Sequence, residues 1–202
     1  VVAKKWGWHD RAIFTVNRSG HLDDLDLRFP VLYRDQVEAN ARSTGVDAGW
    51  IYGVMRQESA FVADAKSVAG ALGLMQLMPR TGRATARRMR LNIRSRSAIM
   101  KVDNNLRLGA FYLKTVLRRH DGNQIVATAA YNAGSHRVNR WLPQQKKLSA
   151  DIWVETIPFN ETRNYVKNVM GFTAIYEHRL DLATTPLADR MAAVTPRRKK
   201  RF

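Results

Sequence analysis

The chain has 202 residues, 45% of them hydrophobic, which is enough for one domain with a real core plus extensions. This composition excludes a disordered or collagen-like protein. No apolar run reaches the roughly 20 residues of a membrane span, and the absence of cysteine excludes disulfides and thiolate metal sites. The net charge of +17 points to a polyanionic partner, for which nucleic acid is the usual candidate.

The N-terminal part of the chain is predicted to be helical. Residues 1–30 show helical patterning with a turn at residues 19–20. A helix is expected over 35–44 and should end at Gly45. Asp47 is then the expected N-cap of the next helix.

Turn and cap residues divide the middle of the chain. The segment 74–78 is short and sharply bounded, so we expect a brief strand or an extended loop there. Pro79 suits the first turn of a helix, and residues 80–96 hold seven arginines and no acid. Asp103 is the expected N-cap of a long helix that reaches about residue 120.

The last third is predicted to alternate between helices and loops. Helices are expected over 123–132 and in the short segment 138–142, whereas 146–159 has mixed signals and is predicted to be a loop. Residues 161–180 form the last predicted helix. Beyond it the pattern decays toward a basic run at the C-terminus, and such runs are usually solvated.

A single glutamate interrupts the apolar face of the helix that follows Asp47. The face continues with Glu58 and Phe61 after four apolar residues at three- and four-residue spacing, Trp50, Ile51, Val54 and Met55. A carboxyl group in a partly apolar setting favours its neutral form, which is what a general acid needs near neutral pH. Taken alone, the helix favours a surface glutamate paired with Arg56 or Lys66 over a functional one.

The residues after Glu58 predict a cleft. Gly70 and Gly73 permit tight turns and close approach of a second backbone or a ligand. Gln76 is a polar side chain between apolar neighbours, so it should find a buried partner or meet a ligand. We therefore expect Glu58 on one wall of a cleft and polar groups of the 67–78 loop on the other.

Four segments together resemble the motifs of the soluble lytic transglycosylases, which cleave bacterial peptidoglycan. They are Glu-Ser-Ala-Phe at 58–61, Gly-Leu-Met-Gln-Leu-Met-Pro at 73–79, Ala-Tyr-Asn-Ala-Gly at 130–134, and the stretch 155–166. Their order and spacing make the resemblance specific, and it covers about residues 29–176. It implies a mainly α, lysozyme-like helical domain with a very small β element flanking the cleft.

The same resemblance implies a division of the chain and a cellular setting. Residues 1–36 are expected to be a helical junction, 37–180 the catalytic domain, and 181–202 an extension with a basic tail. A larger N-terminal helical region is expected in the full-length protein. The expected location is the periplasm of a Gram-negative bacterium, in contact with the wall, with peptidoglycan glycan strands as partner and neither nucleic acid nor a membrane span.

The resemblance also assigns roles to individual residues. By position, Glu58 matches the catalytic acid, Ser67 a hydroxyl that hydrogen-bonds its carboxyl group, and Glu161 a supporting carboxylate. The matches to sugar-contacting positions are Met75, Gln76, Met78, Thr81, Tyr131 and Asn132. No cofactor is implied, and the five histidines show no paired metal-binding spacing.

The implied reaction uses one glutamate. Glu58 would protonate the bond between N-acetylmuramic acid and N-acetylglucosamine, then act as base toward the muramoyl C6 hydroxyl, which gives a 1,6-anhydro sugar without water. The absence of an obvious second carboxylate close after Glu58 is consistent with this, because ordinary glycosidases use two. Three alternatives stay open: hydrolysis as in goose-type lysozymes, a basic nucleic-acid-binding helical protein, and an inactive wall-binding module.

Overall fold

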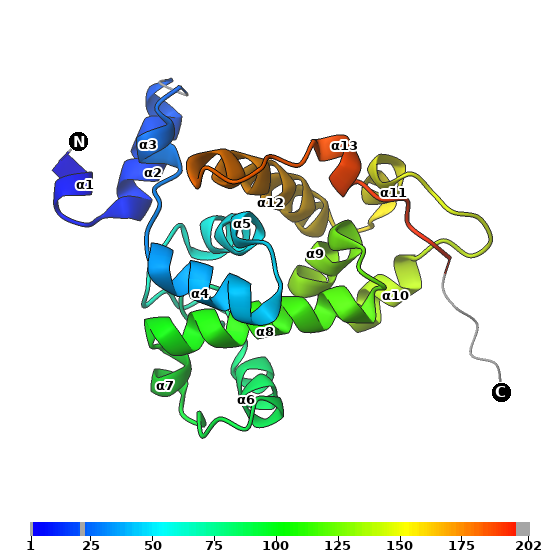
Figure 1. Cartoon of the computed structure of the whole chain (residues 1–202), viewed down its shortest axis with the longest axis horizontal. Helices are drawn as coiled ribbons and strands as arrows, with labels where there is room; N and C mark the ends of the chain where they lie inside the picture. The colour runs from blue at the N-terminus through cyan, green and yellow to red at the C-terminus, as the bar shows by residue number, and fades with distance from the viewer. Residues whose placement is uncertain (1, 21–22, 197–202) are drawn as a thin grey trace.

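The computed structural model describes residues 2–20 and 23–196. It is 64% helical with almost no strand, so the predicted mainly α, lysozyme-like fold is confirmed (Figure 1). The helices are α1 (Val2–Lys5), α2 (His9–Ser19), α3 (Leu25–Arg28), α4 (Arg34–Thr44), α5 (Ala48–Ser59), α6 (Pro79–Arg88), α7 (Arg96–Met100), α8 (Val102–Arg119), α9 (Gln124–Ala133), α10 (Ser135–Trp141), α11 (Ala150–Thr156), α12 (Asn160–Arg179) and α13 (Leu187–Arg190). Within the described residues, β pairing is limited to three isolated bridges, Lys66–Leu72, Leu72–Leu77 and Leu148–Val194.

Helices α5 and α12 pack closely against each other at the centre of the molecule (Figure 1). Two glycines of α5 allow this approach. A Cβ atom on Gly53 would lie 2.9 Å from the Val169 carbonyl oxygen and 2.9 Å from Thr173 Oγ1, and one on Gly49 would lie 3.0 Å from the Thr173 carbonyl oxygen. Because such distances are too short for any larger side chain, the sequence of α5 sets its spacing from α12.

The buried apolar residues form two clusters. The larger one surrounds α5, α8, α9 and α12, and the smaller one lies between the 72–77 turn, α6, α7 and α8. In Figure 1, α6 and α7 lie together on the far side of α8 from α5. Tyr112 and Tyr131 pack against both clusters, so they lie at the boundary between the two.

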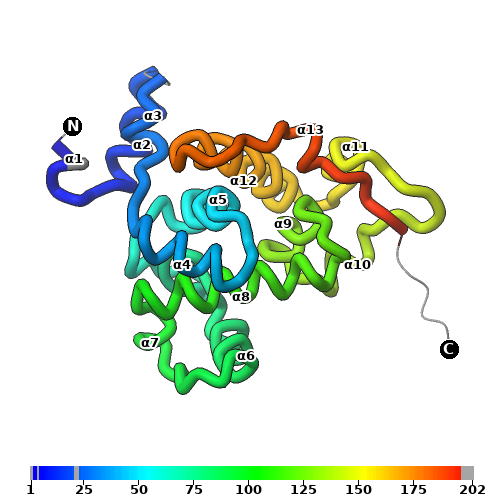
Figure 2. The backbone as a smooth tube through the Cα atoms, in the orientation of Figure 1, coloured from blue at the N-terminus to red at the C-terminus, as the bar shows by residue number. Residues whose placement is uncertain are grey.

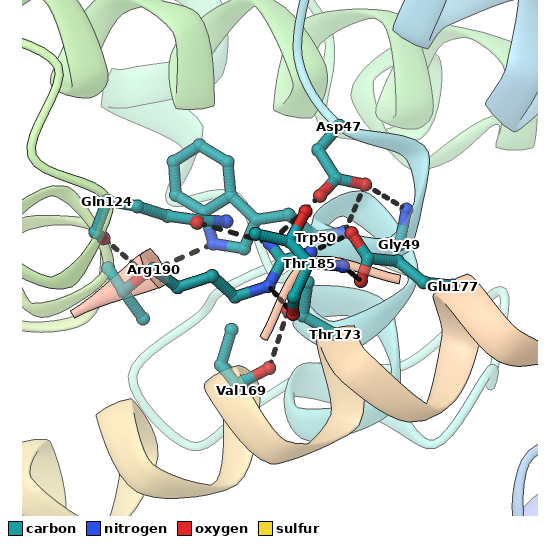
Figure 3. Close-up of polar contacts among 10 residues, drawn as sticks. Asp47, Gly49, Trp50, Gln124, Val169, Thr173, Glu177, Thr185 and Arg190 are labelled. Atoms are coloured by element: carbon teal, nitrogen blue, oxygen red, sulfur yellow. Dashed lines mark hydrogen bonds and ion pairs between the residues drawn. The ribbon is translucent and has the colours of Figure 1, made fainter. Parts of the chain in front are cut away.

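The ends of the chain pack on this body at different places. Figure 2 shows α1 to α3 at one end of the molecule and α10 and α11 at the other. Ile13 of α2 is fully buried in the larger cluster. The side chain of Arg190 in α13 is buried and pairs with Glu177 of α12. It also donates to Asp47 Oδ2 at 3.1 Å and to Gln124 Oε1 at 3.3 Å (Figure 3).

Several predicted boundaries are confirmed and a few are wrong. Asp47 caps α5 as expected, accepting from the Gly49 and Trp50 amides. The loop predicted over 146–159 contains α11, because Ala150, Trp153 and Val154 bury one helical face before Pro158. Helix α8 begins at Val102, one residue before Asp103, which lies in its first turn.

The C-terminal segment is more ordered than the decaying sequence pattern predicted, since it contains α13 and the bridge to Leu148. The predicted basic tail at 197–202 lies outside the described residues. In the part of the chain that the structure describes, no helix has the length and apolar character needed to span a membrane.

Candidate active site

Glu58 lies in the last turn of α5, and the backbone turns sharply directly after it. Ala60 and Phe61 both adopt left-handed conformations, with φ of 47° and 69°. Such values are uncommon for residues other than glycine and are often held by surrounding structure at functional sites. Here the Ser59 hydroxyl accepts from the Phe61 amide at 3.1 Å and donates to the Leu74 carbonyl oxygen at 2.8 Å. The helix end that carries Glu58 is therefore tied to the opposite loop.

The carboxyl group of Glu58 is held in an apolar, hydrogen-bonded setting. Burial raises its pKa to about 7, the hydrogen bond from Tyr165 lowers the pKa, and the charge of Glu161 raises it. The Tyr165 hydroxyl donates to Glu58 Oε1 at 2.7 Å. A glutamate with a pKa near 7 can give up and retake a proton at neutral pH, as a general acid and base must.

Tyr131 is hydrogen-bonded to the 72–77 turn and lies close enough to Glu58 to feel its charge. Its hydroxyl donates to the Met75 carbonyl oxygen at 2.8 Å, and the Met75 amide donates to Asn105 Oδ1 at 2.8 Å. Asn105 is fully buried and also donates to the Leu72 carbonyl oxygen at 2.9 Å. Burial, and next the charge of Glu58, raise the pKa of Tyr131 well above its usual value, so its hydroxyl stays protonated beside the acid.

A pocket of about 610 Å³ opens beside Glu58 and is lined by Ser67 and Gln76 among others. Gln76 adopts a left-handed backbone conformation with φ of 43°. Its side-chain amide nitrogen, Nε2, donates to the carbonyl oxygens of Ala65 and Gly73. The Ser67 hydroxyl accepts from the Ala71 amide at 3.0 Å, so its expected hydrogen bond to the Glu58 carboxyl stays a prediction. The predicted juxtaposition of Glu58 with polar groups of the 67–78 loop is present.

A second polar group lies near Glu58 at the start of α12. Asn132 donates to Glu161 Oε1 at 3.2 Å and accepts from the Thr162 hydroxyl at 2.7 Å. Because the charge of Glu161 raises the pKa of Glu58, this carboxylate belongs to the electrostatic surroundings of the acid. Folding thus brings a second carboxylate toward Glu58 from 103 positions further along the chain.

The remaining predicted sugar contacts differ in their exposure. Met78 is exposed at the N-terminal end of α6, and Thr81 in the first turn of that helix is half-buried. The side chain of Met75 is fully buried and packs on Gly109, so this residue faces the site through its backbone. Contacts between these residues and a sugar stay predictions.

Sequence reasoning missed Tyr165 and Asn105. Asn105 is a polar residue on the buried face of α8 with Leu108 and Val116, and that helical spacing was a usable signal. Tyr165 lies on the buried face of α12, where an aromatic residue is expected for packing alone. No local pattern shows that its hydroxyl meets a carboxyl 107 positions away.

No group of three or more His, Asp or Glu side chains in the described ranges is arranged to hold a metal ion.

The family model "Transglycosylase SLT domain" matches residues 35–154, more than half of the chain. The chain belongs to this family. A second model, "Soluble lytic transglycosylase helical domain", matches residues 156–184 of this SLT-family chain.

Individual relatives agree with the family assignment. The chain is 36% identical over 173 residues to the soluble lytic murein transglycosylase of Salmonella typhimurium. The aligned region covers 85% of this chain and 27% of that protein. A solved structure of lytic transglycosylase Slt from Pseudomonas aeruginosa, an inactive glutamate-to-glutamine mutant, has a TM-score of 0.88 and 42% identity, and the match covers 92% of this chain and 30% of that one. The 70 kDa soluble lytic transglycosylase of Escherichia coli has a TM-score of 0.86 and 32% identity, over 96% and 32% of the two chains. The SLT-family chain therefore spans about a third or less of the length of these relatives.

Proposed function

We propose that this SLT-family chain carries the catalytic centre of a peptidoglycan lytic transglycosylase, with Glu58 as its acid and then its base. The observation that carries the proposal is the Glu58 carboxyl, whose pKa is about 7 and which receives a hydrogen bond from Tyr165 beside an open pocket. The relatives named above as murein transglycosylases support the choice of substrate, and the solved inactive mutant supports an essential glutamate.

The reaction needs one proton that moves twice. Protonated Glu58 gives its proton to the glycosidic oxygen as the bond from that oxygen to the muramoyl C1 breaks, which releases the N-acetylglucosamine end with a new hydroxyl. The Glu58 carboxylate then takes the proton of the muramoyl C6 hydroxyl while that oxygen bonds to C1. The 1,6-anhydro ring forms, Glu58 is protonated again, and no water is consumed.

The neighbours of Glu58 suit this cycle. The Tyr165 hydroxyl stabilises the carboxylate form without adding a charge, and burial stabilises the protonated form, so neither state is far from the other in free energy. Ser67 and Gln76 line the same pocket and are proposed to orient the sugar or the carboxyl group. Met75, Met78, Thr81, Tyr131 and Asn132 are proposed to contribute further contacts along the cleft.

Mass spectrometry of digested peptidoglycan tests the proposal directly. Glu58→Gln should lower the release of muropeptides by at least ~100-fold, the size of a lost general acid, while binding to insoluble peptidoglycan is kept. The products of the unmodified protein should carry 1,6-anhydro ends, which are lighter by one water than reducing ends. Unchanged release from Glu58→Gln would remove this residue from the mechanism.

Hydrolysis is the second candidate, and Glu161 is the observation that favours it. A carboxylate near the acid could in principle orient an attacking water, as in glycosidases that use two carboxyl groups. Glu161 is, however, hydrogen-bonded to Asn132. If the products carry reducing ends and Glu161→Gln lowers their yield, the reaction is hydrolysis.

Nucleic-acid binding rests on what we call the arginine face, which consists of Arg83, Arg87, Arg90 and Arg94. These residues line a pocket of about 560 Å³ and make no ion pair within the described part of the chain. Peptidoglycan is also polyanionic through its peptide carboxylates, so the arginine face is compatible with the proposed substrate. We propose that the protein works in the periplasm, where peptidoglycan lies.

A further inference from the structure

Part of the pocket wall beside Glu58 comes from the N-terminal helix α2. Phe14 and Asn17 of α2 line the same pocket as Glu58, Ser67 and Gln76. The two residues are three positions apart, so they lie on one face of the helix. Phe14 is 52% exposed, which is unusual for so large an apolar side chain beside a buried carboxyl group.

Helix α2 is anchored to the core rather than lying loosely on it. Its neighbouring residues Ala12 and Ile13 are buried, and Ile13 is fully buried in the larger cluster. The position of Phe14 and Asn17 relative to the pocket is therefore set by packing.

Hydrogen bonds also connect α2 to the helix that carries the acid. Asn17 Oδ1 accepts from Arg28 Nε at 3.0 Å, and the Arg28 carbonyl oxygen accepts from Arg56 Nε at 2.9 Å. Arg56 is buried in α5, two positions before Glu58. These contacts connect α2, through Arg28, to the helix that carries the acid.

The chemistry of the α2 wall matches a sugar ring. A pyranose presents an apolar face of C–H groups and a rim of hydroxyl and N-acetyl groups. Phe14 offers an aromatic face for the first, and the Asn17 amide offers a hydrogen-bond donor for the second. Lys66 lines the same pocket and adds a cation beside them, which suits the carboxylates of a stem peptide.

We propose that α2 forms a sugar-binding subsite of the Glu58 cleft, in which Phe14 stacks on one glycan residue and Asn17 donates to its rim. The inference rests on the proposed function, since it assigns the glycan strand as occupant of the pocket. It assigns residues 9–19 to the substrate-binding surface rather than to a connecting segment alone.

The subsite is tested with Phe14→Ala in a Glu58→Gln background, which separates binding from turnover. Loss of an aromatic contact of about 1.4 kcal/mol corresponds to an about tenfold rise in Kd for long peptidoglycan glycan strands, measured by calorimetry. Phe14→Tyr should bind as the parent does. Thr15→Ala is the matched control, because Thr15 is exposed on the same helix and does not line the pocket.

Strand length provides the readout that a merely structural role would not move. Phe14→Ala should weaken binding of strands long enough to reach α2 and leave the shortest substrates unaffected. Equal loss at all lengths, or equal binding by Phe14→Ala and Thr15→Ala, would overturn the subsite. Turnover by the protein that retains Glu58 is measured in parallel. Absence of 1,6-anhydro products from that protein would contradict the proposed function, whereas the binding comparison tests the α2 subsite separately.

Discussion

The raised pKa of Glu58 has a consequence for stability that can be measured without any substrate. In the unfolded chain this carboxyl ionises near 4.5, and in the folded protein near 7. Between these values the folded protein holds one proton more than the unfolded chain, so this group's contribution to the free energy of unfolding falls as the pH rises. The contribution is complete below pH 4.5 and is lost above about pH 7.

The size of the effect follows from the two pKa values. Their difference, 7 − 4.5, is about 2.5, which corresponds to ~3 kcal/mol at about 1.4 kcal/mol for each tenfold step. Glutamine has a similar shape, does not ionise and still offers an oxygen to Tyr165. Glu58→Gln should therefore match the parent protein near pH 4.5 and become more stable than it by up to ~3 kcal/mol near pH 8.

Urea denaturation of both proteins from pH 4.5 to 8 measures this difference. Glu38→Gln is the control, since Glu38 pairs with Arg34 at the surface and that hydrogen bond lowers its pKa. Because a carboxyl with a lowered pKa titrates below about pH 4.5, the effect of this substitution should be small and nearly constant from pH 4.5 to 8. A Glu58→Gln difference that is constant across the range would refute the reasoning, because it would mean that Glu58 ionises alike in the folded and unfolded states.

Four further predictions test other parts of the structure. Tyr165→Phe removes the hydrogen bond that lowers the pKa of Glu58, so the alkaline fall in kcat/KM should move to higher pH. Gly53→Ala should destabilise the protein by about 1–3 kcal/mol because its Cβ meets backbone of α12, whereas Gly171→Ala, with open space around it, should be neutral or stabilising in thermal unfolding. Arg190→Met leaves a buried partner charge unpaired and should cost about 3–5 kcal/mol in urea denaturation, a loss reduced when that partner, Glu177, is changed to Gln as well. Neutralising the arginine face should abolish salt-sensitive retention on DNA but keep muropeptide release within ~3-fold, and parallel loss of both would show that the arginine face takes part in peptidoglycan cleavage.

Local chemistry was enough to predict much of the fold. The helix that carries Glu58 was placed from one capping residue and a run of apolar residues, and the start of α6 was placed from Pro79. These signals act within a few residues of each other. Helix α11 was missed for the same reason, because a 7-residue helix next to a proline leaves too little periodicity to outweigh loop signals.

Residues that act over long separations in sequence could not be predicted in this way. Glu58 marked itself by interrupting an apolar face, but its partners Tyr165 and Glu161 come from α12. The motif predicts a bond from Ser67 to the acid, which stays a prediction, and the structure adds that this hydroxyl accepts from the Ala71 amide. The sequence locates seven arginines in residues 80–96, and the structure shows that four of them line one pocket.

The distance between Glu58 and Tyr165 is set by a contact in which neither takes part. Gly53 precedes Glu58 by five residues and meets the Val169 carbonyl oxygen, four residues after Tyr165. Since α-helices are stiff over so short a span, about 1.5 Å per residue, any displacement at this contact is carried to the hydrogen bond at the acid. We therefore expect Gly53 to influence the pKa of Glu58 through the spacing of α5 and α12. Gly53→Ala should consequently move the alkaline fall in activity in the same direction as Tyr165→Phe, which a loss of stability alone would not do.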